Sequence, residues 1–142
     1  MKKAGVIANP KRPHAADIFD RLARKAEACG IELLADRQTA NHLPSATVLE
    51  FSEFAGNVDV LLALGGDGTV LFCANLLAGT DVPILGVNLG RLGFLADVSP
   101  SEIPHRLDGV LNGQFREARR LLLYAQVMRD GCMIGEADAL ND

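Results

Sequence analysis

Residues 58–69 read VDVLLALGGDGT, an apolar run that ends in a glycine-rich turn. A continuous apolar run of this kind is typical of a strand that is buried on both faces of a parallel sheet. Three glycines then surround a single carboxylate, Asp67. Glycine weakens regular structure, but it lets a ligand approach the backbone closely. The stretch therefore predicts the end of a central strand beside a ligand, with Asp67 next to whatever the glycines admit.

The residues before this stretch predict a strand, a helix and a second strand. Residues 4–8 are a short apolar run, and residues 14–29 carry apolar side chains at three- and four-residue spacing. Gly30 occupies the position of a left-handed helix cap, and residues 31–35 form another apolar run. A strand, amphipathic helix and strand in this order indicate a βαβ unit and hence a mostly parallel sheet.

The residues after the glycine turn continue the alternation of helices and strands. We expect a helix over 69–77, a strand over 83–87 and a second glycine-rich loop, NLGRLGFL, over 88–95. Ser99 and Glu102 have the spacing of a capping box, with Pro100 at the first position of a helix that ends near Leu111. Between the second and third strands the pattern is weaker, and we expect a short helix over 46–54. Residues 1–120 are thus predicted to form an open, mostly parallel α/β sheet with flanking helices.

The last part of the chain has a different pattern. Residues 121–128 and 132–140 are strand-like runs on either side of Asp130-Gly131, a dipeptide that favours hairpin turns. We predict that residues 121–142 are the first strands of a β-rich second domain that is truncated here.

The composition excludes several classes of protein. The chain has 142 residues, of which 49% are hydrophobic, so it can bury a core. Its net charge is -4 and it has no basic block, so nucleic acid is not an expected partner. No apolar run approaches the roughly 18 residues of a membrane span, and the N-terminal run is too short for a signal peptide. Three cysteines without a CxxC pair do not indicate disulfides or zinc. We expect a cytoplasmic protein with no membrane partner.

Both glycine-rich loops follow strands, and ligands of open α/β sheets bind at the carboxyl ends of strands. A helix that begins near Thr69 would direct its amides and positive dipole end toward an anion. Asp67 would repel phosphate, but it can orient a hydroxyl group or accept its proton. The combination indicates phosphoryl transfer to an alcohol.

The alternative is a tight strand-to-helix turn in which Asp67 caps the helix. Neither GxxxxGK[ST] nor GxGxxG is present.

Three motifs resemble those of a known family. GGDGT at 65–69 resembles the signature shared by NAD kinases, lipid kinases and, more loosely, phosphofructokinases. GVNLGRLGFLAD at 86–97 is similar to a loop of NAD kinases that lipid kinases lack, and ALND at 139–142 resembles the Asn-Glu/Asp motif of NAD kinases. The chain therefore resembles the N-terminal part of a bacterial-type NAD kinase.

The resemblance implies ATP-dependent phosphorylation of the 2′-hydroxyl on the adenosine ribose of NAD, giving NADP. It implies that Asp67 is the proton acceptor and that a divalent metal, expected to be magnesium, bridges the ATP phosphates. The implied NAD-binding residues are Asp67, Gly68, Gly93, Phe94, Asn141 and Asp142, the last replacing the commoner glutamate. The implied ATP phosphate-binding residues are Gly65, Gly66 and Thr69. No protein ligand of a metal is predicted.

The resemblance also implies a β-rich second domain that completes the NAD site, and a homo-oligomer at full length. We therefore expect little activity from these 142 residues alone. From the residues alone, Phe94 fits a core position as well as a ligand site, and Asn141 and Asp142 fit a solvated terminus. A lipid (diacylglycerol-type) kinase domain and a non-catalytic nucleotide-binding module stay open as alternatives.

Overall fold

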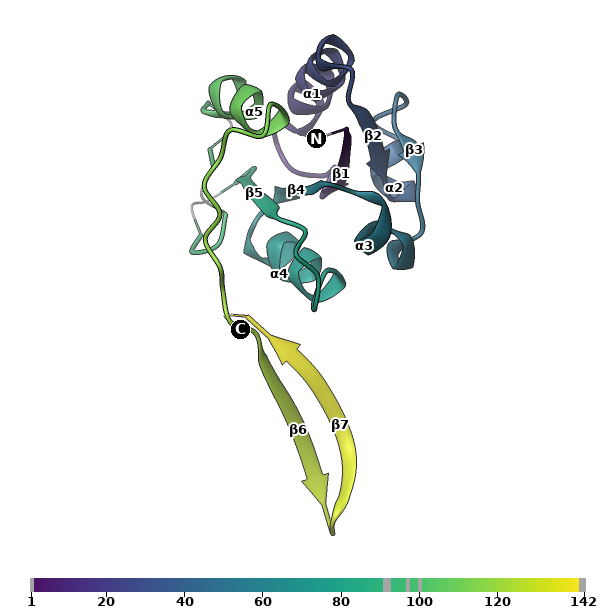
Figure 1. Cartoon of the computed structure of the whole chain (residues 1–142), viewed down its shortest axis with the longest axis vertical. Helices are drawn as coiled ribbons and strands as arrows, with labels where there is room; N and C mark the ends of the chain where they lie inside the picture. The colour runs from purple at the N-terminus through teal and green to yellow at the C-terminus, as the bar shows by residue number, and fades with distance from the viewer. Residues whose placement is uncertain (1, 91–92, 97, 100, 141–142) are drawn as a thin grey trace.

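A five-stranded parallel sheet forms the centre of the molecule (Figure 1). The structure is a computed structural model that describes residues 2–90, 93–96, 98–99 and 101–140. The strand order is β3-β2-β1-β4-β5. The chain therefore adds β2 and β3 on one side of β1 and then β4 and β5 on the other side. The topological switch point therefore lies between β1 and β4. The strands are β1 (Lys3–Ala8), β2 (Glu32–Ala35), β3 (Thr47–Val48), β4 (Val60–Gly65) and β5 (Ile84–Asn88).

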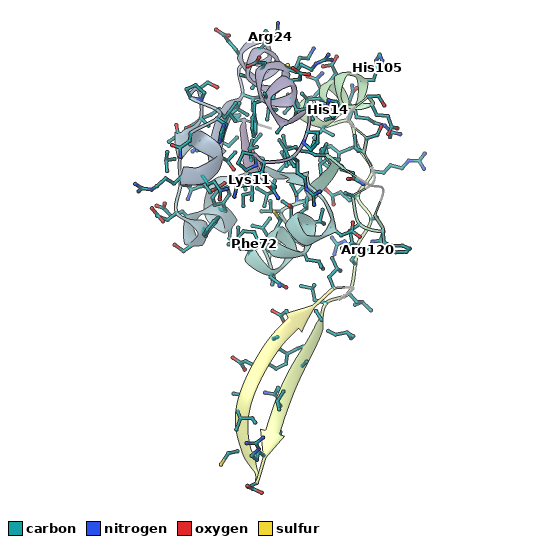
Figure 2. The ribbon with its side chains drawn as sticks, turned by 180° about the vertical axis from the view of Figure 1, so that it is seen from behind. Lys11, His14, Arg24, Phe72, His105 and Arg120 are labelled. Atoms are coloured by element: carbon teal, nitrogen blue, oxygen red, sulfur yellow. The ribbon has the colours of Figure 1, made fainter. Side chains whose placement is uncertain are left out.

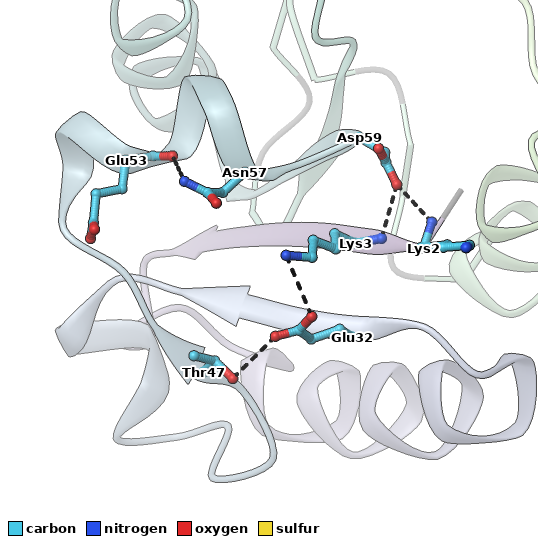
Figure 3. Close-up of polar contacts among 7 residues, drawn as sticks. All are labelled: Lys2, Lys3, Glu32, Thr47, Glu53, Asn57 and Asp59. Atoms are coloured by element: carbon cyan, nitrogen blue, oxygen red, sulfur yellow. Dashed lines mark hydrogen bonds and ion pairs between the residues drawn. The ribbon is translucent and has the colours of Figure 1, made fainter.

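Strand β4 is buried along its whole length, as its apolar sequence predicts. It pairs in parallel with β1 on one side, where Val6 lies opposite Leu62, and with β5 on the other, where Leu62 lies opposite Leu85. Asp59 holds the amino-terminal ends of β1 and β4 together. Its carboxylate accepts the backbone N–H groups of Lys2 and Lys3 at 2.6 and 3.0 Å (Figure 3). Polar contacts at that amino-terminal edge are structural, and the carboxyl-terminal edge carries the glycine loops.

Helices cover both faces of the sheet (Figure 1). Helices α1 (Ala15–Cys29) and α5 (Ile103–Leu111) pack on one face and are joined by an ion pair between Lys25 and Asp108 at 2.7 Å. Helices α3 (Phe54–Asn57) and α4 (Asp67–Leu76) pack on the other face. Gly30 ends α1 with a φ of 65°, which confirms the predicted left-handed cap.

The predicted helix over 46–54 is wrong. Thr47 and Val48 instead pair with β2 as the edge strand β3. The 3-10 turn η1 (Phe51–Glu53) and then α3 follow, and a capping box between Glu50 and Glu53 starts η1. The sequence interpretation also missed α2 (Arg37–Ala40), which begins where the Asp36 carboxylate accepts the N–H groups of Gln38 and Thr39.

Two helix starts differ from the predicted ones. Helix α4 begins at Asp67, two residues before Thr69. Helix α5 begins at Ile103, after a turn in which the Glu102 carboxylate accepts the N–H and hydroxyl of Ser99 at 3.0 and 2.8 Å. The predicted contact between these two residues is therefore present, although it precedes the helix. Pro100, the predicted first helical residue, lies outside the described residues.

The last two strands, β6 (Leu123–Arg129) and β7 (Cys132–Ala139), form an antiparallel hairpin that projects from the α/β body (Figure 1). Its turn is the predicted Asp130-Gly131, with φ values of 51° and 76°. Apolar side chains of the hairpin are exposed, Leu123 by 70%. The assignment of 121–142 to a second domain stays a prediction. None of the helices in the described ranges has the length and apolar character needed to cross a membrane.

Candidate functional site

Three loops meet at the carboxyl edge of the sheet. The N–H of Asn9, after β1, donates to the carbonyl of Leu64 at 2.9 Å. The N–H of Leu89, after β5, donates to the carbonyl of Gly65 at 2.7 Å. The loops after β1, β4 and β5 therefore start side by side at the switch point, where open α/β sheets bind ligands.

The glycines of the loop after β4, which is the first glycine loop, have different structural roles. A Cβ on Gly65 would lie 2.9 Å from the Cβ of Thr69 and still closer to its hydroxyl, so only glycine lets Thr69 fold back over the strand end. Gly66 and Gly68 have no such neighbour within 4 Å, and neither has a positive φ. The fold does not need glycine at these two positions. Their lack of side chains leaves the backbone open to a ligand.

Asp67 is the first residue of α4, but its side chain does not cap that helix. The carboxylate reaches the second glycine loop instead. Oδ2 accepts the N–H of Phe94 at 2.8 Å, and Oδ1 accepts the N–H groups of Leu95 and Ala96 at 3.0 and 3.4 Å. This geometry contradicts the alternative that Asp67 is a helix cap.

The same hydrogen bonds determine the charge of Asp67. The N–H of Phe94, followed by that of Leu95, lowers the pKa of the carboxyl below its ordinary value. Asp67 is therefore ionised at neutral pH. Each carboxylate oxygen can accept about two hydrogen bonds. From the described residues, Oδ1 accepts two hydrogen bonds and Oδ2 accepts one, which leaves Oδ2 capacity for one further donor.

Gly93 makes this contact possible. A Cβ on Gly93 would lie 2.6 Å from Oδ2 of Asp67 and closer still to Oδ1, so any side chain would displace the carboxylate. The structure thus brings together Asp67 and Gly93, which the sequence placed in separate motifs.

Phe94 is not a core residue, which is one of its two sequence interpretations. Its side chain is 86% exposed, and only its backbone N–H is tied to Asp67. The aromatic ring is consequently available to a ligand beside the carboxylate. Asn141 and Asp142 lie outside the described residues, so their predicted contacts with NAD stay a prediction.

Sequence reasoning missed three features of the site. It missed the amides of Leu95 and Ala96, which carry no side-chain signal. It also missed Asn88, which is buried with 3% of its surface exposed. The Oδ1 of Asn88 accepts the N–H of Gly90 at 2.9 Å. An asparagine two residues before a glycine at a strand end is the available signal for this turn. Arg12 is the third, and its guanidinium lies beside Gly90.

The fold and these loops define an open α/β protein with a glycine-lined candidate site at its topological switch point. The family model described as the ATP-NAD kinase N-terminal domain matches residues 4–115. The chain therefore belongs to the NAD kinase family.

Relatives over the whole chain agree with this membership. The chain is 38% identical over 147 residues to the NAD kinase of Chromohalobacter salexigens, covering 100% of this chain and 49% of that protein. It is 36% identical over 144 residues to the NAD kinase of Laribacter hongkongensis, covering 100% of this chain and 50% of that protein. The chain thus spans about half the length of these relatives. Family membership also disfavours the lipid kinase alternative.

A solved structure shows the same fold. The crystal structure of yeast NADH kinase complexed with NADH superposes with a TM-score of 0.82 at 18% sequence identity. The match covers 98% of this chain and 46% of the yeast chain. It confirms the predicted arrangement of a parallel sheet with flanking helices followed by antiparallel strands.

Proposed function

We propose that this chain is the part of an NAD kinase that carries the catalytic carboxylate. The reaction is phosphoryl transfer from ATP to the 2′-hydroxyl on the adenosine ribose of NAD, which forms NADP. One observation carries the proposal: an ionised carboxylate, Asp67, is fixed by three backbone amides and has one oxygen with capacity for a hydroxyl donor. Gly66 and Gly68, which the fold leaves open, flank it on both sides.

In the proposed step, Oδ2 of Asp67 accepts the hydrogen bond of the 2′-hydroxyl and orients its oxygen toward the γ-phosphorus of ATP. The new bond joins that oxygen to the γ-phosphorus, and the bond to the β–γ bridging oxygen breaks, releasing ADP. The hydroxyl proton passes to Asp67. Because the pKa of Asp67 is lowered, the carboxylate is a weak base, and its main contribution is orientation. The loose transition state of phosphoryl transfer depends mostly on positioning and charge stabilisation.

The ATP phosphates are assigned to Gly65, Gly66 and Thr69 at the start of α4. The positive end of this ten-residue helix faces the same edge of the sheet. Within the described part of the chain, no group of three His, Cys, Asp or Glu side chains could hold a metal ion. We assign no protein ligand to the metal, since magnesium is commonly held by substrate phosphates with few protein ligands. The metal would arrive with ATP and neutralise the phosphate charge.

The NAD side of the site is assigned to Gly68, Gly93 and Phe94, with Asn141 and Asp142. The exposed ring of Phe94 offers a surface for the adenosine. Since the chain spans about half of its relatives, we also assign completion of this side to a C-terminal half like theirs. We further propose a cytoplasmic homo-oligomer for the full-length form.

The test measures NADP formation from ATP and NAD by this chain and by a version that carries the C-terminal half found in its relatives. We expect turnover mainly in the longer version. Asp67→Asn in that version should lower kcat by about 10²- to 10⁴-fold. Undiminished activity in the variant would contradict the role of Asp67. Nucleotide binding without turnover in either version would support a non-catalytic module, and lipid phosphorylation without NADP formation would support a lipid kinase.

A further inference from the structure

Arg12 reaches from the loop after β1 to the loop after β5. Its backbone N–H donates to the carbonyl of Asn9 at 3.1 Å, so its Cα lies in the turn that leaves β1. A Cβ on Gly90 would lie 3.3 Å from Nη1 of Arg12, so the guanidinium lies against the turn that leaves β5.

Strand β4 lies between β1 and β5 in the sheet. Neighbouring strands are about 4.8 Å apart, so β1 and β5 are separated by roughly twice that distance, which the long arginine side chain can bridge. The contact between Arg12 and Gly90 therefore joins the loops on either side of β4, the strand whose carboxyl end leads into Gly65 and Gly66. Arg12 thus carries a positive charge between the two loops that flank the strand before the proposed phosphate site.

The charge of Arg12 is not neutralised by an acidic side chain of the described residues, because none of the ion pairs found among them includes it. Asp67 is an anionic group at this edge, and its carboxylate, which accepts backbone amides, repels phosphate. A phosphate chain bound beside an ionised carboxylate needs compensating positive charge, and a guanidinium would add to the charge of the metal that accompanies ATP. Guanidinium groups bind phosphate oxygens through strong charge-assisted hydrogen bonds.

We propose that Arg12 binds the phosphate chain of ATP across the end of β4, as a residue that determines affinity for the phosphoryl donor and not for NAD. This assignment rests on the proposed function of the glycine loop. Asn9 and Gly90 support the contact: the side-chain Oδ1 of Asn9 accepts the N–H of Lys11 at 3.2 Å and orders the loop after β1. Gly90 leaves room for the guanidinium on the loop after β5.

Three variants test the assignment. Arg12→Gln removes the charge, Arg12→Lys keeps it without the fork of donors, and Arg24→Gln is the matched control. Arg24 is exposed toward the distal end of α1, away from Lys11 and His14 (Figure 2), and its Nε donates to the carbonyl of Asp20 in its own helix. Thermal unfolding of each variant establishes that the fold is kept.

Two measurements are made. The first is the affinity of the 142-residue chain for inorganic tripolyphosphate by calorimetry. The second is the KM for ATP and for NAD in the version with the C-terminal half. Losing one charge-assisted hydrogen bond corresponds to about a tenfold or larger loss of affinity. We expect Arg12→Gln to weaken tripolyphosphate binding and raise the KM for ATP by about tenfold, with the KM for NAD unchanged. Arg12→Lys should recover part of the loss, and Arg24→Gln should match the unsubstituted protein.

The outcomes separate this inference from the proposed function. Unchanged tripolyphosphate binding and KM for ATP in Arg12→Gln, with NADP formation lost in Asp67→Asn, would overturn the role of Arg12 alone. A raised KM for NAD instead of ATP would also overturn it. If the unsubstituted protein forms no NADP, the proposed function fails. The affinity for tripolyphosphate then decides the role of Arg12. The phosphate contact is rejected if Arg12→Gln binds tripolyphosphate as tightly as the unsubstituted chain, or if the unsubstituted chain does not bind it.

Discussion

The hydroxyl of Thr39 accepts a hydrogen bond from the backbone N–H of Ala8 at 3.0 Å. It donates in turn to the carboxylate of Asp36. Ala8 is the last residue of β1, whereas β2 has already ended at Ala35, so a side chain replaces the missing strand partner. The end of β1 is thereby fixed just where the loop that carries Arg12 begins.

Thr39→Val should destabilise the protein although the two side chains have nearly the same shape. Thr39 is fully buried, and the change leaves the N–H of Ala8 without its partner. We expect a loss of about 1–3 kcal/mol in the free energy of unfolding, measured by urea denaturation. Thr47→Val is the control, because Thr47 is exposed on the edge strand and should change the value by no more than about 0.5 kcal/mol. Equal losses in the two variants would contradict the importance of the Ala8 contact.

Gly93→Ala should separate the two glycine loops. The added Cβ would collide with the carboxylate of Asp67, so the amides of Phe94 and Leu95 should lose their acceptor. Hydrogen exchange of these two amides is expected to accelerate, and the cost of the collision is about 1–3 kcal/mol of stability. Gly56→Ala in α3 meets no atom within 4 Å and should leave both amides protected. Unchanged exchange in Gly93→Ala would show that the loop tolerates the side chain.

Gly68→Ala should have opposite effects on stability and on nucleotide binding. Gly68 lies in the first turn of α4 and has open space around its Cα, so alanine should raise the free energy of unfolding by about 0.4–1 kcal/mol. The same methyl group should obstruct a nucleotide at this backbone, so NAD and ATP should bind more weakly. Gly56→Ala offers the comparison of a helical glycine away from the loops, where nucleotide binding should not change. If Gly68→Ala binds nucleotide normally, the open space at Gly68 has no role in binding.

Asp67→Asn should lower stability in a pH-dependent way. Backbone amides hold the pKa of Asp67 below its ordinary value of about 3.9. A lowered folded-state pKa stabilises the fold above the unfolded pKa, and this contribution disappears as the pH falls through the folded pKa. The Tm difference between Asp67→Asn and the unsubstituted protein should therefore be clear at pH 7 and shrink as the pH falls below about 3.9. Asp20→Asn, exposed on α1, serves as the control. The same Tm difference for Asp67→Asn at pH 7 and at low pH would rule out this linkage.

The strands and long helices could be predicted because their signals are local. The apolar run before Gly65 and the periodicity before Gly30 indicate β4 and α1 without knowledge of the neighbours. Residues 37–57 could not be predicted in this way. A two-residue edge strand exists only because β2 offers it a partner, and that partnership is tertiary.

The candidate site was predictable as residues but not as contacts. The motifs indicated Asp67 and Phe94, and the resemblance gave them roles. The hydrogen bond that joins them uses a backbone amide, which every residue except proline possesses, so no residue type reveals it. The position of Arg12 was hidden for a related reason. Its reach to Gly90 depends on the order of strands in the sheet, which a single sequence leaves open.

The central position of β1 has a consequence for synthesis of the chain. Ala4 pairs with Val60, so the first strand made stays without one neighbour until β4 has left the ribosome. The loop at residues 93–96 follows later still. Early parts of the chain can form the unit of β1, α1 and β2, but the proposed nucleotide site is not assembled at that stage. Ligands stabilise only states that bind them, so under the proposed function cellular nucleotides should assist the last step of folding and leave the first ones unaided.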